Sequence, residues 1–471
     1  MKRSFSIRIE RSIKATINNQ NRNLCFYVFQ KILGMNNFIK IQIITFIFTI
    51  TFTSLKAQEL LTPENAVTLA ISKNFDIVLA KNEADIATIN NNKATAGMLP
   101  KINVTTGDVF NLNNIDQKFT TGQEVKKNWV PVNSFNAGLN LNWTIFDGLK
   151  MFATKDKLAA LQSLGEIQLK NQIQNTVAQV LNAYYEIVRQ KQQIKALNES
   201  AKISTERVSL SQKKFDVGYS DKTPLLQAKV DYSSQQINIL KQETILQQSK
   251  VALNKILGRE ANIAFDVIDT IEVSYQPNLQ TIKDTALQQN FSLKSAMKNI
   301  EIAKLQHKEI NAQRLPSINF STGYQFTQNN SKAGFQLSNR TYGPTLGVNA
   351  VVPIFNGGMV KKQLESSAVN IATQQVQLEQ IKNDIDANIL TAYQNFDYAQ
   401  KVLKLNEENV KVAQENVQVT LERYRLNQST SIEIKQAQSS YEDALYNVIL
   451  ARYNAKIAEI ELKKISNELV K

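Results

Sequence analysis

The residue types that most often perform chemistry are scarce in this chain. Its 471 residues include one histidine, His307, and one cysteine, Cys25. A histidine acts as a general base, or activates a nucleophile, only when a second group orients it, and His307 stands alone in a polar helical run. The sequence therefore predicts that His307 is a solvated surface residue. A single cysteine also excludes a disulfide within the chain.

The other common signatures of a reactive site are missing from the sequence. It has no glycine-rich phosphate loop and no group of His, Cys, Asp and Glu residues at metal-ligand spacing. We therefore expect no enzymatic activity, no metal and no cofactor. What the chain does must follow from the elements it builds and from the surfaces they present.

An apolar segment near the N-terminus has the pattern of a secretory signal peptide. The run MNNFIKIQIITFIFTITFTSLKA, residues 35–57, has a positive charge at Lys40, an apolar core and a small residue, Ala57, at the expected cleavage point. A membrane anchor is the alternative, but the apolar core is shorter than the roughly 20 residues that a spanning helix needs. Residues 1–34 show no periodicity, and we expect them to be an upstream non-native extension.

Much of the +14 net charge comes from this N-terminal part. Nine of the 55 basic and one of the 41 acidic residues precede residue 58, so the rest of the chain holds 46 basic and 40 acidic residues. The pI of 9.4 is then a weak reason to expect nucleic-acid binding, and export argues against such a partner.

Most of the remaining sequence is one unit used twice. The motif IFDG at 145–148 recurs as IFNG at 354–357, after 209 residues. LPKINVTTG at 99–107 recurs as LPSINFSTG at 315–323, after 216 residues, so the first unit has a longer hairpin loop. We predict two structural repeats, 58–258 and 279–471, joined by an equatorial linker, 259–278.

Each repeat has the same expected order of elements: helix, strand, strand, long helix and return helix. In the first repeat they are expected at 63–98, 102–110, 135–146, 149–215 and 223–257. In the second they are expected at 279–314, 318–326, 346–354, 358–424 and 431–470. The two long runs contain no proline and almost no glycine, and at 1.5 Å per residue each would be roughly 100 Å long. Such a helix, with a narrow apolar seam, suits the wall of a water-filled tube better than a compact globule.

The predicted strands have the size and patterning of membrane-spanning β-strands. Each alternates apolar and polar side chains over roughly 9–12 residues. Aromatic residues lie near their ends: Phe110, Trp143, Phe146, Tyr324, Phe326 and Phe355. Four strands are too few to close a barrel, and unpaired strand edges are not tolerated in lipid, so closure requires several chains. Gly138 and Gly347 lie in mid-strand and indicate close approach or curvature there.

This combination resembles the TolC family of outer-membrane channel-tunnel proteins over residues 59–471. The motifs that carry the resemblance are IFDG and IFNGG, AYYEIV and AYQNFDYA, and the two helix-break segments KKFDVGYSDKTPLLQAKVDY and ERYRLNQSTSIEIKQAQSSY. The resemblance implies an α+β membrane protein that forms a homotrimer. Four strands from each chain would make a twelve-stranded transmembrane β-barrel, continued by a long periplasmic α-helical barrel that is closed at its far tip.

The resemblance implies that the chain is an exit duct in the cell outer membrane. It would serve a tripartite efflux or type I secretion system and passively carry small molecules or proteins to the outside. The implied partners are outer-membrane lipid, a periplasmic adaptor (a membrane fusion protein) and an inner-membrane pump of the RND, ABC or a similar class. The alternative is a structural coiled-coil or adhesin-type surface protein, which explains the long helices but not the strands.

In the family, the turns between the long and return helices contact the adaptor. The corresponding residues of the first turn are Phe215, Val217, Gly218, Tyr219 and Ser220. Those of the second turn are Tyr424, Leu426, Asn427, Gln428 and Ser429. Asn427 replaces the usual glycine, and asparagine tolerates the left-handed conformation better than most residues. The alternative is that both turns are only helix connections.

The resemblance also implies a gate after the second turn, where some members carry two acidic residues. The corresponding positions here are Glu433 and Gln436. Three copies of Glu433 around a threefold axis would raise the pKa of the carboxyl groups and attract cations. A solvated glutamate on a helix surface is the alternative.

The repeated IFDG and IFNG motifs mark the change from strand to helix. We expect Asp147 and Asn356 to cap the long helices with their side chains, while the following glycines ease the bend. Whether Gly148 is the bend itself or only adjoins it stays open at this point. The junction residues are Phe146, Asp147, Gly148, Phe355, Asn356 and Gly357. Tyr184, Tyr185, Tyr393 and Phe396 are expected to pack between helices rather than to bind ligands.

Overall fold

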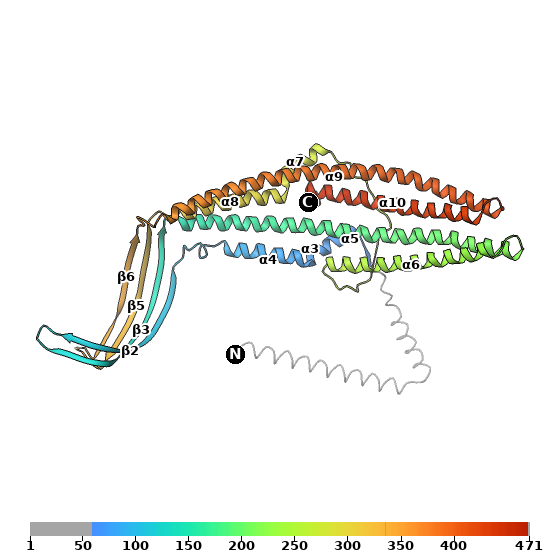
Figure 1. Cartoon of the computed structure of the whole chain (residues 1–471). Helices are drawn as coiled ribbons and strands as arrows, with labels where there is room; N and C mark the ends of the chain where they lie inside the picture. Colours follow the sequence, from blue (N-terminus) through green and yellow to red (C-terminus); the bar gives the residue numbers. More distant parts are fainter. Residues whose placement is uncertain (1–58, 335, 470–471) are drawn as a thin grey trace, which may run out of the picture. The chain divides into compact units, whose positions relative to one another are not determined.

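The structure of the chain, a computed structural model, describes residues 59–334 and 336–469 (Figure 1). The predicted extension at 1–34, the signal peptide at 35–57 and Cys25 lie outside the described residues. All the described elements lie within the compact unit Leu61–Lys471, except that the first strand begins at Glu59.

This unit shows the same order of elements twice. The first half contains α3 (Pro63–Lys73), α4 (Phe75–Asn90), β2 (Lys101–Lys118), β3 (Glu124–Asp147), α5 (Lys150–Asp216) and α6 (Thr223–Ile256). The second half contains α7 (Leu279–Gln289), α8 (Phe291–Ala312), β5 (Ser317–Ser331), β6 (Ser338–Val351), α9 (Met359–Arg425) and α10 (Ser431–Ile465). Two strands of three residues, β1 (Glu59–Leu61) and β4 (Phe265–Val267), fall outside this pattern.

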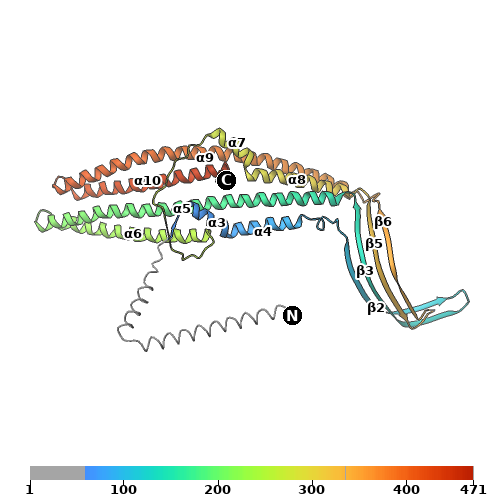
Figure 2. The same ribbon diagram turned by 180° about the vertical axis from the view of Figure 1, so that it is seen from behind.

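The long helices agree with the sequence prediction. α5 and α9 each have 67 residues, and their ends lie within one residue of the expected positions. α6 and α10 return along them as antiparallel partners, and the turns between the helices lie at the end away from the sheet (Figures 1 and 2). Among the described residues, no helix combines the length and the apolar character needed to cross a membrane.

The first helix of each repeat was expected to be continuous, and this expectation is wrong. An asparagine in extended conformation, Asn74 or Asn290, separates α3 from α4 and α7 from α8. The Asn74 Oδ1 accepts hydrogen bonds from two backbone N–H groups at the start of α4, at 2.9 and 3.1 Å. Asn290 does the same for α8, at 2.9 and 3.2 Å. The asparagine Oδ1 accepts hydrogen bonds that backbone carbonyl groups would accept in a continuous helix. One helix therefore ends and a new one begins at this residue.

The four longer strands form one antiparallel sheet in the order β2-β3-β5-β6. They contain 18, 24, 15 and 14 residues and are longer than expected, because the tails rich in Asn, Thr and Gln pair as well. Phe110, Tyr324 and Phe326 therefore do not lie at strand ends. Phe355 lies beyond β6, which ends at Val351. Gly138 fits against the Gln325 side chain of the neighbouring strand, which a Cβ there would overlap.

A compact core joins the linker between the repeats to the middle of α5. Tyr184 is fully buried, donates a hydrogen bond from its hydroxyl to the Leu61 carbonyl at 2.8 Å and accepts one from the Ile268 N–H at 3.2 Å. In the other half, Phe396 is buried and its ring meets that of Tyr275 edge to face, with centroids 6.0 Å apart. The four expected aromatic packing residues thus contact the core, with Tyr185 and Tyr393 at its margin.

His307 is not the freely solvated residue that the sequence predicted. It is half-buried, and its Nδ1 lies 2.7 Å from the Ser367 Oγ, a contact that joins α8 to α9. The pattern of polar residues around it could not show that its partner comes from a helix 60 residues away.

We predict that Asn74→Ala lowers the free energy of unfolding by about 1 kcal/mol or somewhat more, the usual effect of losing an N-cap. The loss should exceed that of Asn290→Ala, because the Asn74 Nδ2 also donates to the Ile256 carbonyl at 2.7 Å. Urea unfolding followed by far-UV circular dichroism measures both variants. Asn74→Ser is the control that keeps a capping oxygen. Equal losses for the two alanine variants would contradict a role for the bond to Ile256.

Candidate functional site

The junction between sheet and tunnel helix is built on two consecutive left-handed residues in each half. Gly148 and Leu149 have φ values of 72° and 71°, and Gly357 and Gly358 have values of 67° and 77°. Leucine rarely adopts this conformation, so position 149 is strained, whereas glycine satisfies it freely in the second half. Gly148 is therefore part of the bend itself. It is also packed so closely that a Cβ would overlap the Ala312 carbonyl oxygen.

Asp147 caps α5, but from two residues before the N-cap position. Its Oδ1 accepts a hydrogen bond from the Met151 N–H at 3.0 Å. The second half differs, because there the Asn356 backbone carbonyl accepts from the Met359 N–H at 3.3 Å and the N-cap, Gly358, has no side-chain cap hydrogen bond. Phe146 is half-buried beside this bend, and Phe355 is exposed.

The two tip turns have the same backbone form. Gly218 and Asn427 both occupy the left-handed region, with φ values of 74° and 62°. The Tyr219 N–H donates to the Lys214 carbonyl at 2.9 Å, and the Gln428 N–H donates to the Arg423 carbonyl at 2.8 Å. These bonds satisfy carbonyl groups at the ends of the long helices. The expectation that Asn427 can replace glycine is confirmed.

The side chains of the two turns are placed differently. Val217 and Leu426 are 78% and 67% exposed, and Tyr219 is exposed as well. Tyr424, which corresponds in sequence to Phe215, is only 4% exposed. Its hydroxyl lies 3.0 Å from the Ser211 Oγ of α5, so within this chain it packs between the helices instead of facing outward. The remaining turn residues are Ser220 in the first turn and Gln428 and Ser429 in the second.

Lys214 reinforces the position of Tyr424. Its Nζ donates to the Tyr424 carbonyl at 2.5 Å and lies 3.6 Å from the centre of the tyrosine ring. Burial lowers the pKa of Lys214 below its usual value. The contact fixes the start of the second turn against the end of α5.

A buried polar network close to the tips joins the two helical hairpins. Arg207 of α5 is 2% exposed and donates to the Gln438 Oε1 at 2.9 Å and to the Asp231 Oδ2 at 3.1 Å. Lys435 of α10 donates to the other oxygen of Asp231 at 2.9 Å. Burial alone would raise the pKa of Asp231, but hydrogen bonds from Lys435, Gln227 and Arg207 hold it below its ordinary value. The sequence could not show this network, because Gln, Lys and Arg occur on every face of these helices.

Glu433 has a local role that the sequence analysis did not consider. It is the third residue of α10 and forms a capping box with Thr430: the Glu433 N–H donates to the Thr430 Oγ1 at 3.2 Å, and the Thr430 N–H donates to the Glu433 Oε2 at 3.0 Å. The Ser429 hydroxyl and this N–H hold the pKa of the Glu433 carboxyl below its ordinary value. Within one chain the direction is thus opposite to that expected from a ring of like charges. Glu433 and Gln436 are both exposed.

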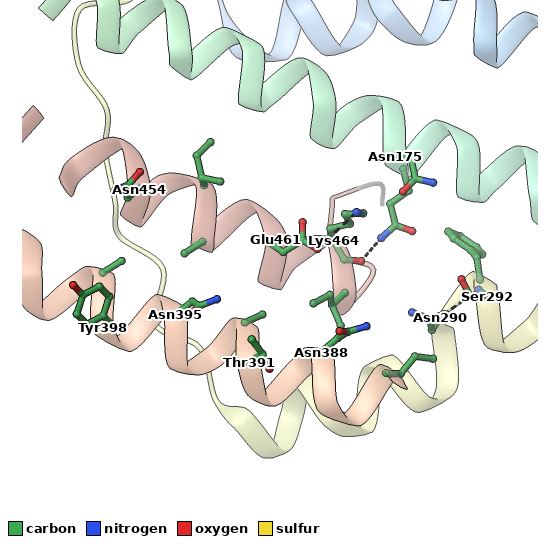
Figure 3. Close-up of a pocket in the computed structure, with 18 of the residues that line it drawn as sticks. Asn175, Asn290, Ser292, Asn388, Thr391, Asn395, Tyr398, Asn454, Glu461 and Lys464 are labelled. Carbon is green, nitrogen blue, oxygen red and sulfur yellow. Dashed lines mark hydrogen bonds and ion pairs between the residues drawn. The ribbon is translucent and has the colours of Figure 1, made fainter. Parts of the chain in front are cut away.

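A cavity of about 800 Å³ lies where α10 ends and α8 begins (Figure 3). Its walls are rich in amides, including Asn175, Asn388 and Asn454, with Glu461 and Lys464 as charged groups. At the equivalent place in the first half, Gly258 packs too closely against the Lys73 carbonyl to admit a Cβ. Amide and aliphatic side chains make up most of the cavity lining, so the cavity offers a largely uncharged binding surface.

Comparison with known proteins places the chain among relatives of similar length. The profile of the family described as "Outer membrane efflux protein" matches residues 66–259 and 283–468. Outer membrane protein TolC of Vibrio cholerae is 21% identical over 393 residues, which cover 82% of this chain and 86% of that protein. Proteases secretion protein PrtF of Dickeya chrysanthemi is 17% identical over 436 residues, which cover 91% and 92%.

Solved structures show the same fold. The crystal structure of CusC has a TM-score of 0.70 at 16% identity and covers 86% of this chain and 91% of its own. That of VceC from Vibrio cholerae has a TM-score of 0.67 at 16% identity, with coverage of 86% and 95%. The architecture is therefore that of the channel-tunnel proteins.

We predict that Arg207→Ala loosens the packing of the two hairpins near the tips. Removing one partner of a buried ion pair typically costs about 3–5 kcal/mol, and here Asp231 and Gln438 would both lose a hydrogen bond. Hydrogen exchange at the C-terminal turns of α5 and α9 should become faster. Lys202→Ala is the matched control, since its ion pair with Glu199 is exposed to solvent and contributes little. Unchanged exchange in Arg207→Ala would show that the network does not hold the hairpins together.

Proposed function

The chain belongs to the outer membrane efflux protein family, and we propose that three copies of it assemble into one closed duct. Its place is the outer membrane, with a helical tunnel in the periplasm, and it is an exit duct for efflux or type I secretion. We propose that transport is passive and that the duct has no catalytic activity of its own.

The observation that carries the proposal is the exposed apolar face of the sheet. Strand pairing places Val104, Leu139 and Tyr324 side by side, and Val104 is 78% exposed. Leu346 and Val348 continue this face on β6 and are also exposed. Such a surface is stable against lipid but not in water, and a band of similar height occurs on transmembrane barrels.

The open edges of the sheet explain why several copies are needed. β2 and β6 lie at the two edges of the four-stranded sheet, so each leaves a row of backbone groups without a partner strand within the described residues. Lipid offers these groups no hydrogen bonds. Pairing β6 of one copy with β2 of the next satisfies them, and three copies give a barrel of twelve strands.

The helices have a second surface that needs a neighbour. α9 carries exposed apolar residues, the last four of them at intervals of seven: Val369, Val376, Tyr398, Leu405, Val412 and Val419. α6 carries a comparable exposed set: Leu226, Val230, Ile237 and Leu240. Spacing of this kind is typical of helices that pack side by side along a shallow supercoil. We propose that neighbouring copies cover these stripes in the trimer.

The tip turns are the proposed contact with a periplasmic adaptor that connects the duct to an inner-membrane pump. Val217, Tyr219 and Leu426 are exposed apolar side chains at the far end of the tunnel and need a partner to bury them. Tyr424 supports the turn from inside. The repeats at 58–258 and 279–471, with the linker at 259–278, are the units that we propose for this architecture.

We propose that Glu433 also contributes charge to a gate, with Gln436 as its neutral neighbour. We predict that Glu433→Gln lowers block by divalent cations in planar bilayers while leaving the helix cap largely intact, because glutamine can also complete a capping box. Glu433→Ala should remove both roles and lower thermal stability as well. If Glu433→Gln conducts and is blocked like the unaltered protein, Glu433 acts only as a cap.

We predict that Leu405→Glu combined with Val412→Glu abolishes the trimer, because two carboxylates would be buried without partners in the proposed contact. The measurement is migration of outer-membrane extracts on gels with and without heating, together with conductance in planar bilayers. Lys404→Glu combined with Lys411→Glu is the control, which introduces the same groups at adjacent exposed positions. A soluble monomer that forms no channel, recovered from the unaltered protein, would overturn the proposed function.

A further inference from the structure

The second face of the sheet is polar and almost free of charge. Four complete rows of paired residues lie on it, from Asn103, Asn140, Gly323 and Thr345 to Val109, Ser134, Asn329 and Asn339. Every side chain in these rows is Asn, Gln, Ser, Thr, Val or Gly. Because paired residues of neighbouring strands point to the same side, these side chains form one continuous uncharged surface.

Hydrogen bonds between strands hold parts of this surface together. The Asn140 Nδ2 donates to the Thr105 Oγ1 at 3.0 Å, and the Thr144 hydroxyl donates to the Asn319 Oδ1 at 2.9 Å. Amide and hydroxyl groups that are hydrogen-bonded in this way hydrate readily and carry no net charge. The surface can face water without attracting either sign of ion.

Two charged residues of these strands lie on the polar face at the end nearest the helices. Asp147, the last residue of β3, pairs with Ser317 there, is half-buried and accepts a hydrogen bond from the Met151 N–H. Lys101, the first residue of β2, pairs with Asn142, which pairs with Ser321, so it lies on the polar face at the end of the sheet nearest the helices. It is exposed and forms no salt bridge within the part of the chain that the structure describes. Two further charges, Asp108 and Arg340, lie near the other end of the paired rows, in a row with Phe135 and Gln328 on the opposite, apolar face.

We propose that Lys101 is the charge-selecting residue of the barrel part of the duct. The inference rests on the proposed trimer: if the apolar face meets lipid, the polar face lines the lumen, and three copies of Lys101 form one cationic ring at its inner end. Beyond the ring the amide rows pass solutes of either charge alike. Rings of basic side chains favour anions in narrow pores, so Lys101 biases this part of the duct toward anionic solutes.

The test is the reversal potential of the purified duct in planar bilayers across a KCl gradient at low ionic strength, where charges are least screened. Lys101→Gln should lower the chloride-to-potassium permeability ratio by about twofold, since a ring of charges shifts the local potential by a small multiple of kT. Lys101→Glu should lower it further. Asn140→Asp, on the same face in an uncharged row, should shift the ratio in the same direction.

Arg340→Gln is the matched control, because it also removes one positive charge from the sheet, but from the apolar face. It should leave the reversal potential unchanged. The inference fails if Lys101→Gln and Lys101→Glu conduct with the unaltered ratio, or if Arg340→Gln shifts it as far as Lys101→Gln does. A complete absence of channels from the unaltered protein would instead overturn the proposed function on which the inference rests.

Discussion

The structure depends above all on the unpaired edges of its sheet. Four strands with one apolar face can be placed in lipid only if the backbone groups of β2 and β6 find partners, and a single chain does not supply them. Assembly then requires that the helices attached to the sheet also meet their neighbours. The exposed stripes on α6 and α9 follow from this requirement, since side chains such as Leu240 and Leu405 would be costly to leave in water. In the proposed trimer, membrane insertion and the contacts between helices of neighbouring copies therefore both follow from one sheet whose edges stay unpaired within the described residues.

The duplicated unit solves the same local problems twice but not identically. Both junctions use a pair of left-handed residues, yet the first places Leu149 where the second has Gly358. Each return helix, α6 or α10, ends near the asparagine that caps the second helix of its own half. In the first half the Asn74 Nδ2 donates to the Ile256 carbonyl at the end of α6. In the second half Leu462 of α10 belongs to one buried cluster with Ile282 of α7 and Leu293 of α8, and a cavity of about 800 Å³ lies beside these elements. The two halves therefore share backbone geometry and differ in the side chains that join their parts.

The sequence predicted the elements best where the pattern was long and uniform. The ends of α5 and α9 were placed within one residue, because the two runs contain no proline and only one glycine, Gly165, and clear breakers follow. The strands were predicted too short, because the asparagines in their tails favour loops unless a neighbouring strand pairs with them. The breaks at Asn74 and Asn290 were missed, since one capping side chain decides between a continuous and an interrupted helix. Buried contacts such as that between Arg207 and Asp231 depend on which helices meet, and a single sequence does not contain that information.

The two tip turns have similar sequences but differ in which side chains they expose. Phe215 and Tyr424 occupy equivalent positions, but Phe215 is 37% exposed and Tyr424 only 4%. The difference arises because Ser211 and Lys214 of α5 both contact Tyr424, and these contacts tie the second hairpin to the first. The first turn, with Val217 and Tyr219 exposed, has an apolar surface suited to a partner protein. The second turn is held in place by α5 through these two contacts. Any movement of the second turn away from α5 must break the contacts of Tyr424 with Ser211 and Lys214, whereas the exposed side chains of the first turn can stay in place.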